Sequence, residues 1–283
     1  MLYFYKEIKP FPQMIYKKFV PPLHLKPYVE CFYVWESYFS QPLLVESPPS
    51  AFTSMVFNYG IPYAVQNAKY ESVAVPQAFL TGQATTSYRL SLAGAIGMVG
   101  IVFRPAGMHT LFNLPLGELT DERLNITEIL RGGEIRVLQD KIIESQTTVE
   151  RIGLLTQFLN IQLMKNEYRF DAVDFTANQI VDAKGIINVS DIMNNLFMCR
   201  RQFERKFFQK VGLSPKFYAR TRRLGYLCSL MAGKREVNWQ HMLYDCGYYD
   251  QAHFIKDFTA FLGRTPTDYL KNNVELSHFL KNA

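Results

Sequence analysis

The sequence predicts an α+β protein. A β-rich N-terminal domain, either a small barrel or a sandwich with flanking helices, precedes an all-α domain with two helix-turn-helix units joined by a linker helix. Short aromatic and β-branched runs, separated by Gly and Pro, fill the first ~110 residues. Helical periodicity then takes over. Residues 199–218 and 250–269 form an internal repeat at a constant offset of 51.

The N-terminal strands are predicted from runs that are rich in aromatic and β-branched residues and bounded by turn signals. Such residues fit the pleated, half-buried surface of a sheet. Four separate strands are expected, at 28–37, 54–59, 87–92 and 97–103. Several short strands with intervening Gly and Pro are typical of a sandwich or small barrel.

After Pro105 the pattern becomes helical, at 106–112, 134–143 and 147–166. The last of these segments carries an amphipathic stripe at three- and four-residue steps, made of Val149, Ile152, Leu155, Leu159 and Leu163. This stripe either packs on its own domain or forms a dimer seam. The polar stretch 165–172 marks a boundary, which divides the chain into domains at 1–166 and 167–283.

Each copy of the repeat reads as a helix, a glycine stop and a second helix that is opened by Ser-Pro or Thr-Pro. Gly212 and Gly263 suit a left-handed helix end. Ser214 and Thr265 suit N-caps, with proline at the first helical position. Asp250 is expected to cap the helix that follows it, rather than to form a metal or acid–base pair with His253.

A short helix before each copy, at 189–196 and 238–246, completes a helix-turn-helix unit whose second helix enters the DNA major groove. We call these second helices the reading helices. Their aromatic residues share one face, and the opposite face carries the predicted DNA contacts, because Arg reads guanine, Gln reads adenine and small residues allow close approach. The predicted contacts are Arg200, Arg201, Gln202, Arg205, Gln209, Gln251, Ala252, His253 and Lys256.

One long helix at 214–234 is expected to hold the two reading helices at a fixed separation. Two such helices about 34 Å apart meet successive turns of DNA, so one chain can read a two-part, asymmetric site. On this linker helix, Arg222 and Arg223 are expected to be surface charges or phosphate contacts.

Charge also points to a polyanionic partner. The chain has a net charge of +6, yet residues 184–283 alone hold 16 Lys+Arg against 8 Asp+Glu. No apolar run is long enough for a membrane helix, the start lacks a signal-peptide pattern, and the four cysteines are scattered. A reduced, cytoplasmic setting is therefore expected, with no cofactor and no metal.

The residues at 200–224 and 246–269 resemble the DNA-binding domain of the AraC/XylS family of bacterial transcription regulators. The second stretch, CGYYDQAHFIKDFTAFLGRTPTDY, is close to the family signature. The resemblance implies double-stranded DNA as partner, together with RNA polymerase, a small-molecule effector or a homodimer as further candidates. Two positions depart from the family pattern: Phe197 replaces a turn glycine, and Cys199 replaces an N-cap serine, which predicts a first reading helix prone to fraying.

The N-terminal part resembles a companion domain of some AraC-type regulators through residues 97–122. The resemblance implies ligand sensing or dimerisation and names no ligand. Arg104 is a weak candidate for binding an acidic ligand, with anchoring of the strand-to-helix junction as the stronger alternative. The protein is predicted not to be an enzyme. An enzyme domain fused to a DNA anchor and a protein-interaction module stay as alternatives.

Overall fold

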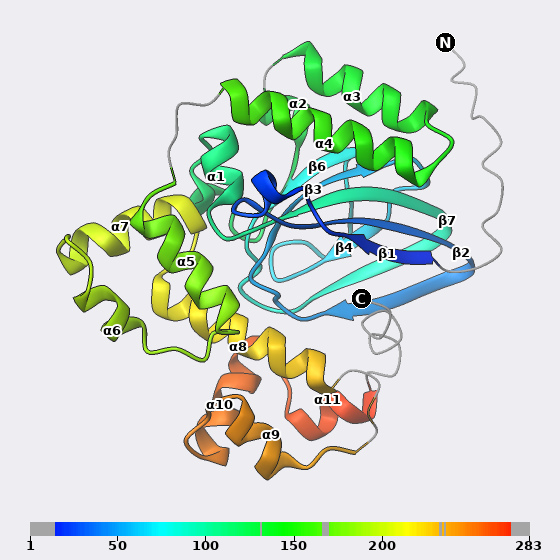
Figure 1. The fold of residues 1–283 in the computed structure, drawn as a ribbon. Coiled ribbons are helices and arrows are strands. Elements are labelled where there is room, and N and C mark those ends of the chain that lie inside the picture. Colours follow the sequence, from blue (N-terminus) through cyan, green and yellow to red (C-terminus); the bar gives the residue numbers. More distant parts are fainter. Residues whose placement is uncertain (1–14, 131, 166–169, 232–233, 235, 273–283) are drawn as a thin grey trace.

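The computed structural model describes residues 15–130, 132–165, 170–231, 234 and 236–272. Within them, one curled antiparallel sheet of eight strands is followed by helices, and the predicted fold class is confirmed (Figure 1). The sheet order is β1-β2-β7-β3-β6-β8, with β4 and β5 attached beside β7. The strands are β1 Ile15–Phe19, β2 Val29–Ser47, β3 Thr53–Asn58, β4 Ala64–Gln66, β5 Val73–Ala74, β6 Ala78–Thr81, β7 Tyr88–Phe103 and β8 Arg123–Asn125.

Two long strands, β2 and β7, form the spine of the sheet. The expected strands at 87–92 and 97–103 are one continuous strand, and the run expected at 28–37 continues to Ser47. A register shift between Phe39 and Leu43, opposite Gly94 at φ +68°, bends the pair without ending it. The sequence prediction of two separate strands was wrong because these bend residues resemble turn residues.

Helices cover one face of the sheet: α1 Gly107–Phe112, α2 Ile126–Ile129, α3 Gly133–Glu144 and α4 Thr148–Lys165, with 3-10 turns η1 Leu23–Leu25 and η2 Leu116–Leu119. In Figure 1, α3 and α4 lie side by side above the strands. Leu155 and Leu159 of α4 are buried in the core beneath these helices, whereas Val149 is 79% exposed. The buried part of the amphipathic stripe therefore packs within its own domain.

The second half of the chain is helical: α5 Ala172–Asp182, α6 Val189–Asn194, α7 Arg200–Val211, α8 Pro215–Met231, α9 Trp239–Asp245, α10 Gln251–Leu262 and α11 Pro266–Asn272. Helices α6–α7 and α9–α10 form the two helix-turn-helix units, and α8 runs between them (Figure 1). Residues 166–169, within the stretch taken as the domain boundary, lie outside the described residues. None of the helices in the described ranges has the length and apolar content needed to cross a membrane.

The helical half rests against the sheet through hydrogen bonds from well-separated segments. The Tyr218 hydroxyl of α8 donates to the Ala51 carbonyl at 2.9 Å. The Ser87 backbone N–H donates to the Phe261 carbonyl of α10 at 3.0 Å. One apolar cluster also continues from inside the curled sheet, at Trp35 and Met98, into the helices α8–α11. Both helix-turn-helix units are thus fixed to the N-terminal half.

Candidate nucleic-acid interface

The first reading helix, α7, is fixed by one buried face. Phe203, Phe207 and Val211 are at most 1% exposed, and the Phe203 and Phe207 ring centroids lie 5.6 Å apart. Gly212 ends the helix at φ +88°, as the sequence predicts. The opposite face is open to solvent, and all five predicted contacts on it are exposed: Arg200, Arg201, Gln202, Arg205 and Gln209. Arg200 also pairs with Glu204 at 2.9 Å.

The second reading helix, α10, repeats this arrangement. The residues that pack α10 against the core are the buried Phe254, Phe258, Phe261 and Leu262. The predicted contacts Gln251, Ala252, His253 and Lys256 are all exposed. The two helices therefore present two separate patches of basic, amide and small side chains, and each patch is backed by an aromatic core.

The caps differ between the two units. The Asp250 carboxylate accepts a hydrogen bond from the His253 backbone N–H at 2.7 Å. Cys199, at the equivalent position before α7, makes no side-chain capping bond, although α7 runs for 12 residues. At the following helices, the Ser214 hydroxyl accepts from the Phe217 N–H at 3.4 Å and the Thr265 hydroxyl from the Asp268 N–H at 3.2 Å. No group of three or more potential metal ligands occurs among the described residues.

The linker helix α8 is bonded directly to the second reading helix. The buried Asp257 carboxylate accepts from Arg220 at 2.7 Å, and Arg223 lies 3.6 Å from it. His253 Nε2 lies 3.9 Å from the same carboxylate. Arg223 also stacks over the Tyr248 ring at 4.5 Å. Burial raises the pKa of the Tyr248 phenol, which keeps the ring neutral beside these charges.

The linker arginines are therefore not free surface charges. Arg222 donates to the Ser50 carbonyl at 2.8 Å and lies 4.1 Å from the centroid of the Phe52 ring. Arg223 is occupied by Asp257 and Tyr248, as described above. The expectation of free surface charges was wrong for both residues, because their partners lie far away in the sequence. Phosphate contact stays a prediction.

A basic groove of about 510 Å³ lies between the two units. Its charged lining comes from the start of α7, from α8 and from α10: Arg200, Glu204, Lys216, Arg220, Arg223 and His253. Lys216 is exposed and has no ion-pair partner among the described residues. The groove thus connects the two exposed patches with a surface that favours anions.

Comparison with known proteins agrees with this geometry. Residues 192–272 match the family model described as a helix-turn-helix domain. The C-terminal part is an AraC-type helix-turn-helix domain. Residues 17–125, ahead of the AraC-type domain, match a model described as a domain of unknown function (DUF6597). No curated protein matches the chain.

Solved structures that match include ToxT from Vibrio cholerae, which is 16% identical over 85% of this chain and 97% of ToxT, with a TM-score of 0.44. A ToxT structure described as bound to unsaturated fatty acid is 15% identical over 84% of this chain and 94% of that chain, with a TM-score of 0.44. The AraC-like transcriptional activator CuxR is 13% identical over 75% of this chain and 94% of its own, with a TM-score of 0.27.

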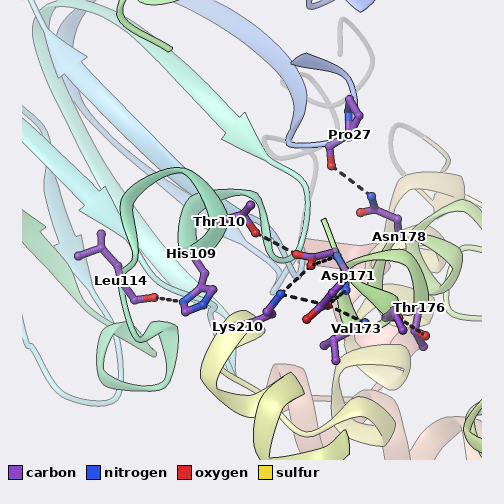
Figure 2. Close-up of polar contacts among 11 residues, drawn as sticks. Pro27, His109, Thr110, Leu114, Asp171, Val173, Thr176, Asn178 and Lys210 are labelled. Atoms are coloured by element: carbon purple, nitrogen blue, oxygen red, sulfur yellow. Dashed lines mark hydrogen bonds and ion pairs between the residues drawn. The ribbon is translucent and has the colours of Figure 1, made fainter. Parts of the chain in front are cut away.

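A polar cluster attaches the first unit of the AraC-type domain to the N-terminal half (Figure 2). Lys210, in the last turn of α7, lies 2.6 Å from the buried Asp174 carboxylate and 3.0 Å from Asp171, the N-cap of α5. Asp174 also accepts from the Thr110 hydroxyl of α1 at 2.9 Å. Gly212, directly after α7, receives a hydrogen bond on its carbonyl from Thr120 at 3.0 Å.

Arg104 serves the same junction. Its guanidinium contacts Asp182 at 2.6 Å, Glu30 at 3.3 Å and the Asn178 side-chain oxygen at 3.1 Å. Its side chain thus joins the end of β7 to α5. These contacts favour an anchoring role for Arg104 over contact with an acidic ligand.

The interior of the curled sheet contains two adjacent cavities, of about 230 Å³ and 560 Å³. Both are lined by Tyr16, Trp35, Ser50, Phe52, Ser54, Leu90 and Val102. Cys31 lines the larger one, and burial raises the pKa of its thiol to about 11, which disfavours the thiolate form. Ser50 and Phe52 also contact Arg222 of the AraC-type domain, so two residues of the cavity wall touch the linker helix.

Proposed function

We propose that this protein is a sequence-specific transcription regulator that binds double-stranded DNA through both reading helices. One observation carries the proposal: α7 and α10 each present exposed basic, amide and small side chains opposite a buried aromatic face, and α8 joins them. In this proposal Arg201, Arg205 and Gln202 of the first helix and Gln251, His253 and Lys256 of the second read bases or contact phosphates. Ala252 allows close approach, and Arg200 and Gln209 flank the first patch.

The proposal includes control by a small molecule bound inside the curled sheet. The division into a sensor or dimerisation domain at 1–166 and a DNA-binding domain at 167–283 is part of it. The cavity volumes fall in the range of small-molecule sites, roughly 300–1,000 Å³, or just below it. A ligand that displaced Ser50 or Phe52 would shift Arg222 and hence α8, which carries both units. RNA polymerase and a second copy of the chain are the further proposed partners.

DNA binding by the purified full chain tests the proposal. The DNA upstream of the protein's own gene serves as the probe, and its dissociation constant is measured at several salt concentrations. We expect log affinity to fall linearly with log salt, with a slope near −0.9 for each phosphate contacted. A variant carrying Arg205→Ala and Lys256→Ala together is the matched control, with a smaller slope expected. Affinity that barely changes between low and moderate salt would contradict DNA binding.

A further inference from the structure

Each reading helix is preceded by an aromatic ring with no cover. Phe197, in the turn between α6 and α7, is fully exposed, and Tyr249, in the turn between α9 and α10, is 96% exposed. Among the described residues these are the most exposed aromatic side chains. A single exposed apolar side chain needs no explanation. Two of them, one in each of the equivalent turns of a duplicated unit, do, although the two positions differ by one residue in the repeat.

The two rings lie in equivalent turns, at positions that differ by one residue. Phe197 lies three residues before the first residue of α7, and Tyr249 lies two residues before the first residue of α10. In each turn the neighbouring residue points inward instead. Met198 packs against the core of the first unit, and Tyr248 is 7% exposed against Phe254. An anchored neighbour in each turn thus leaves the other ring facing solvent.

The place of the rings suggests their partner. In a helix-turn-helix domain the N-terminal residues of the reading helix contact base edges, so the preceding turn lies at the edge of the major groove. Exposed Arg200 and Arg201 follow Phe197, and exposed Gln251 and Ala252 follow Tyr249. The positive charge near Phe197 favours a polyanion over an apolar protein surface, and at Tyr249 the argument rests on the place of the ring before the second reading helix. The apolar group that DNA offers in the major groove is the thymine methyl.

We propose that Phe197 and Tyr249 are DNA contacts, each placing its ring against a thymine methyl at the edge of the groove that its reading helix enters. This rests on the proposed DNA-binding function. The two rings would add preference for thymine at the outer edge of each half of the site, beside the hydrogen-bonding residues of the helices. Tyr249 can in addition donate its hydroxyl to a phosphate, whereas Phe197 contributes apolar contact alone.

The test starts from a DNA site that the wild-type chain selects from a random pool. Dissociation constants are then measured for wild type, Phe197→Ala, Tyr249→Ala and Tyr249→Phe. Tyr244→Ala is the matched control, because Tyr244 is 83% exposed but belongs to α9 rather than to the turn. We expect roughly ten-fold weaker binding for each turn variant that loses its ring, near wild-type binding for Tyr249→Phe, and no change for Tyr244→Ala. Thermal unfolding of all four variants should match wild type, since none of these rings is buried.

Replacing single thymines of the site by deoxyuridine removes only the methyl group. At the contacted thymine this replacement should weaken wild-type binding and leave Phe197→Ala or Tyr249→Ala unaffected, which is the coupling expected for a direct contact. If the wild-type chain binds the site and both Phe197→Ala and Tyr249→Ala bind it equally well, the ring contacts are wrong, whereas the proposed DNA binding stands. Weaker binding without coupling to any methyl overturns the thymine contact. Failure of the wild-type chain to select any DNA overturns the proposed function as well.

Discussion

Arg220 of the linker helix and Asp257 of the second reading helix lie 2.7 Å apart, and the Asp257 side chain is only 5% exposed. The second bond, from Arg220 Nε to the other carboxylate oxygen, is 3.3 Å long. Two-point contact of this kind fixes orientation as well as distance. The direction of the second reading helix is therefore set by the linker helix, independently of any DNA.

Removing this arginine should destabilise the second unit. Arg220→Met keeps the aliphatic stem but leaves the buried Asp257 carboxylate with only the more distant Arg223, at 3.6 Å, and the His253 ring, at 3.9 Å. We expect a loss of about 1–3 kcal/mol in the free energy of unfolding, measured by urea denaturation. Lys216→Met, which removes an exposed cation from the same helix, is the control. Equal stability of the two variants would show that the Arg220 pair contributes nothing.

The buried aromatic side chains of the reading helices should contribute more to the free energy of unfolding than the exposed charged side chains on their opposite faces. Phe258 is fully buried, with ring centroids 5.5 Å from Phe254 and 5.4 Å from Tyr269. Phe258→Ala leaves a cavity and should cost about 3–5 kcal/mol. Phe208→Ala is the comparison, because Phe208 is 51% exposed on the first reading helix. Its cost in calorimetric unfolding should be much smaller.

Single substitutions on the exposed faces should act on DNA rather than on folding. Arg205→Ala should weaken binding by about 1–3 kcal/mol and relax preference at one base pair if it reads guanine. Lys256→Ala should weaken binding to all sequences if it contacts phosphate, and lower the salt slope by about 1. Competition among randomised sites distinguishes the two results. Unchanged affinity and preference for Arg205→Ala would show that the recognition face is misplaced.

Stability should fall on mild acidification because of His109. This histidine is 3% exposed and donates from Nδ1 to the Leu114 carbonyl at 2.7 Å. Burial lowers its pKa below the usual 6.5, with help from the nearby Lys210 charge, and outweighs the hydrogen bond to Leu114, which raises the pKa. Well above pH 6.5 the histidine is neutral in both the folded and the unfolded state, and its contribution is complete. As the pH falls from 6.5 through the lowered pKa, the unfolded chain takes up a proton that the folded chain resists, so stability is lost.

Unfolding free energies of wild type and His109→Gln between pH 7.5 and about 4.5 measure this loss. The difference between the two proteins should depend on pH, with wild type declining more steeply. His24→Gln serves as the control, since His24 bonds to Asn160 at the surface. Parallel curves for wild type and His109→Gln would remove His109 as the cause.

The helical half was the more predictable part because its signals are local. Gly212, Gly263 and Asp250 adopt their expected roles since a cap or a helix end depends on neighbours within a few residues. The bend of β7 was not predictable, because Gly94 has the same sequence signature in a bend as in a turn. The contacts of Arg222 could not be predicted either, because its partners Ser50 and Phe52 are about 170 residues away in the sequence. The DNA-contacting roles of the exposed residues stay predictions.

The contacts between the two halves of the chain bear on how it folds. Tyr218 is 167 residues from its partner Ala51, Arg222 is 172 from Ser50, and Arg264 is 218 from Glu46. The helix-turn-helix units, by contrast, are built from neighbours within a few turns of the chain, and such local contacts form fast. The N-terminal sheet is synthesised before the helical half, so it can form before the helices are available to dock onto it. We therefore expect assembly in two stages, in which the helical units form early and their docking onto the finished sheet is the slow, final step.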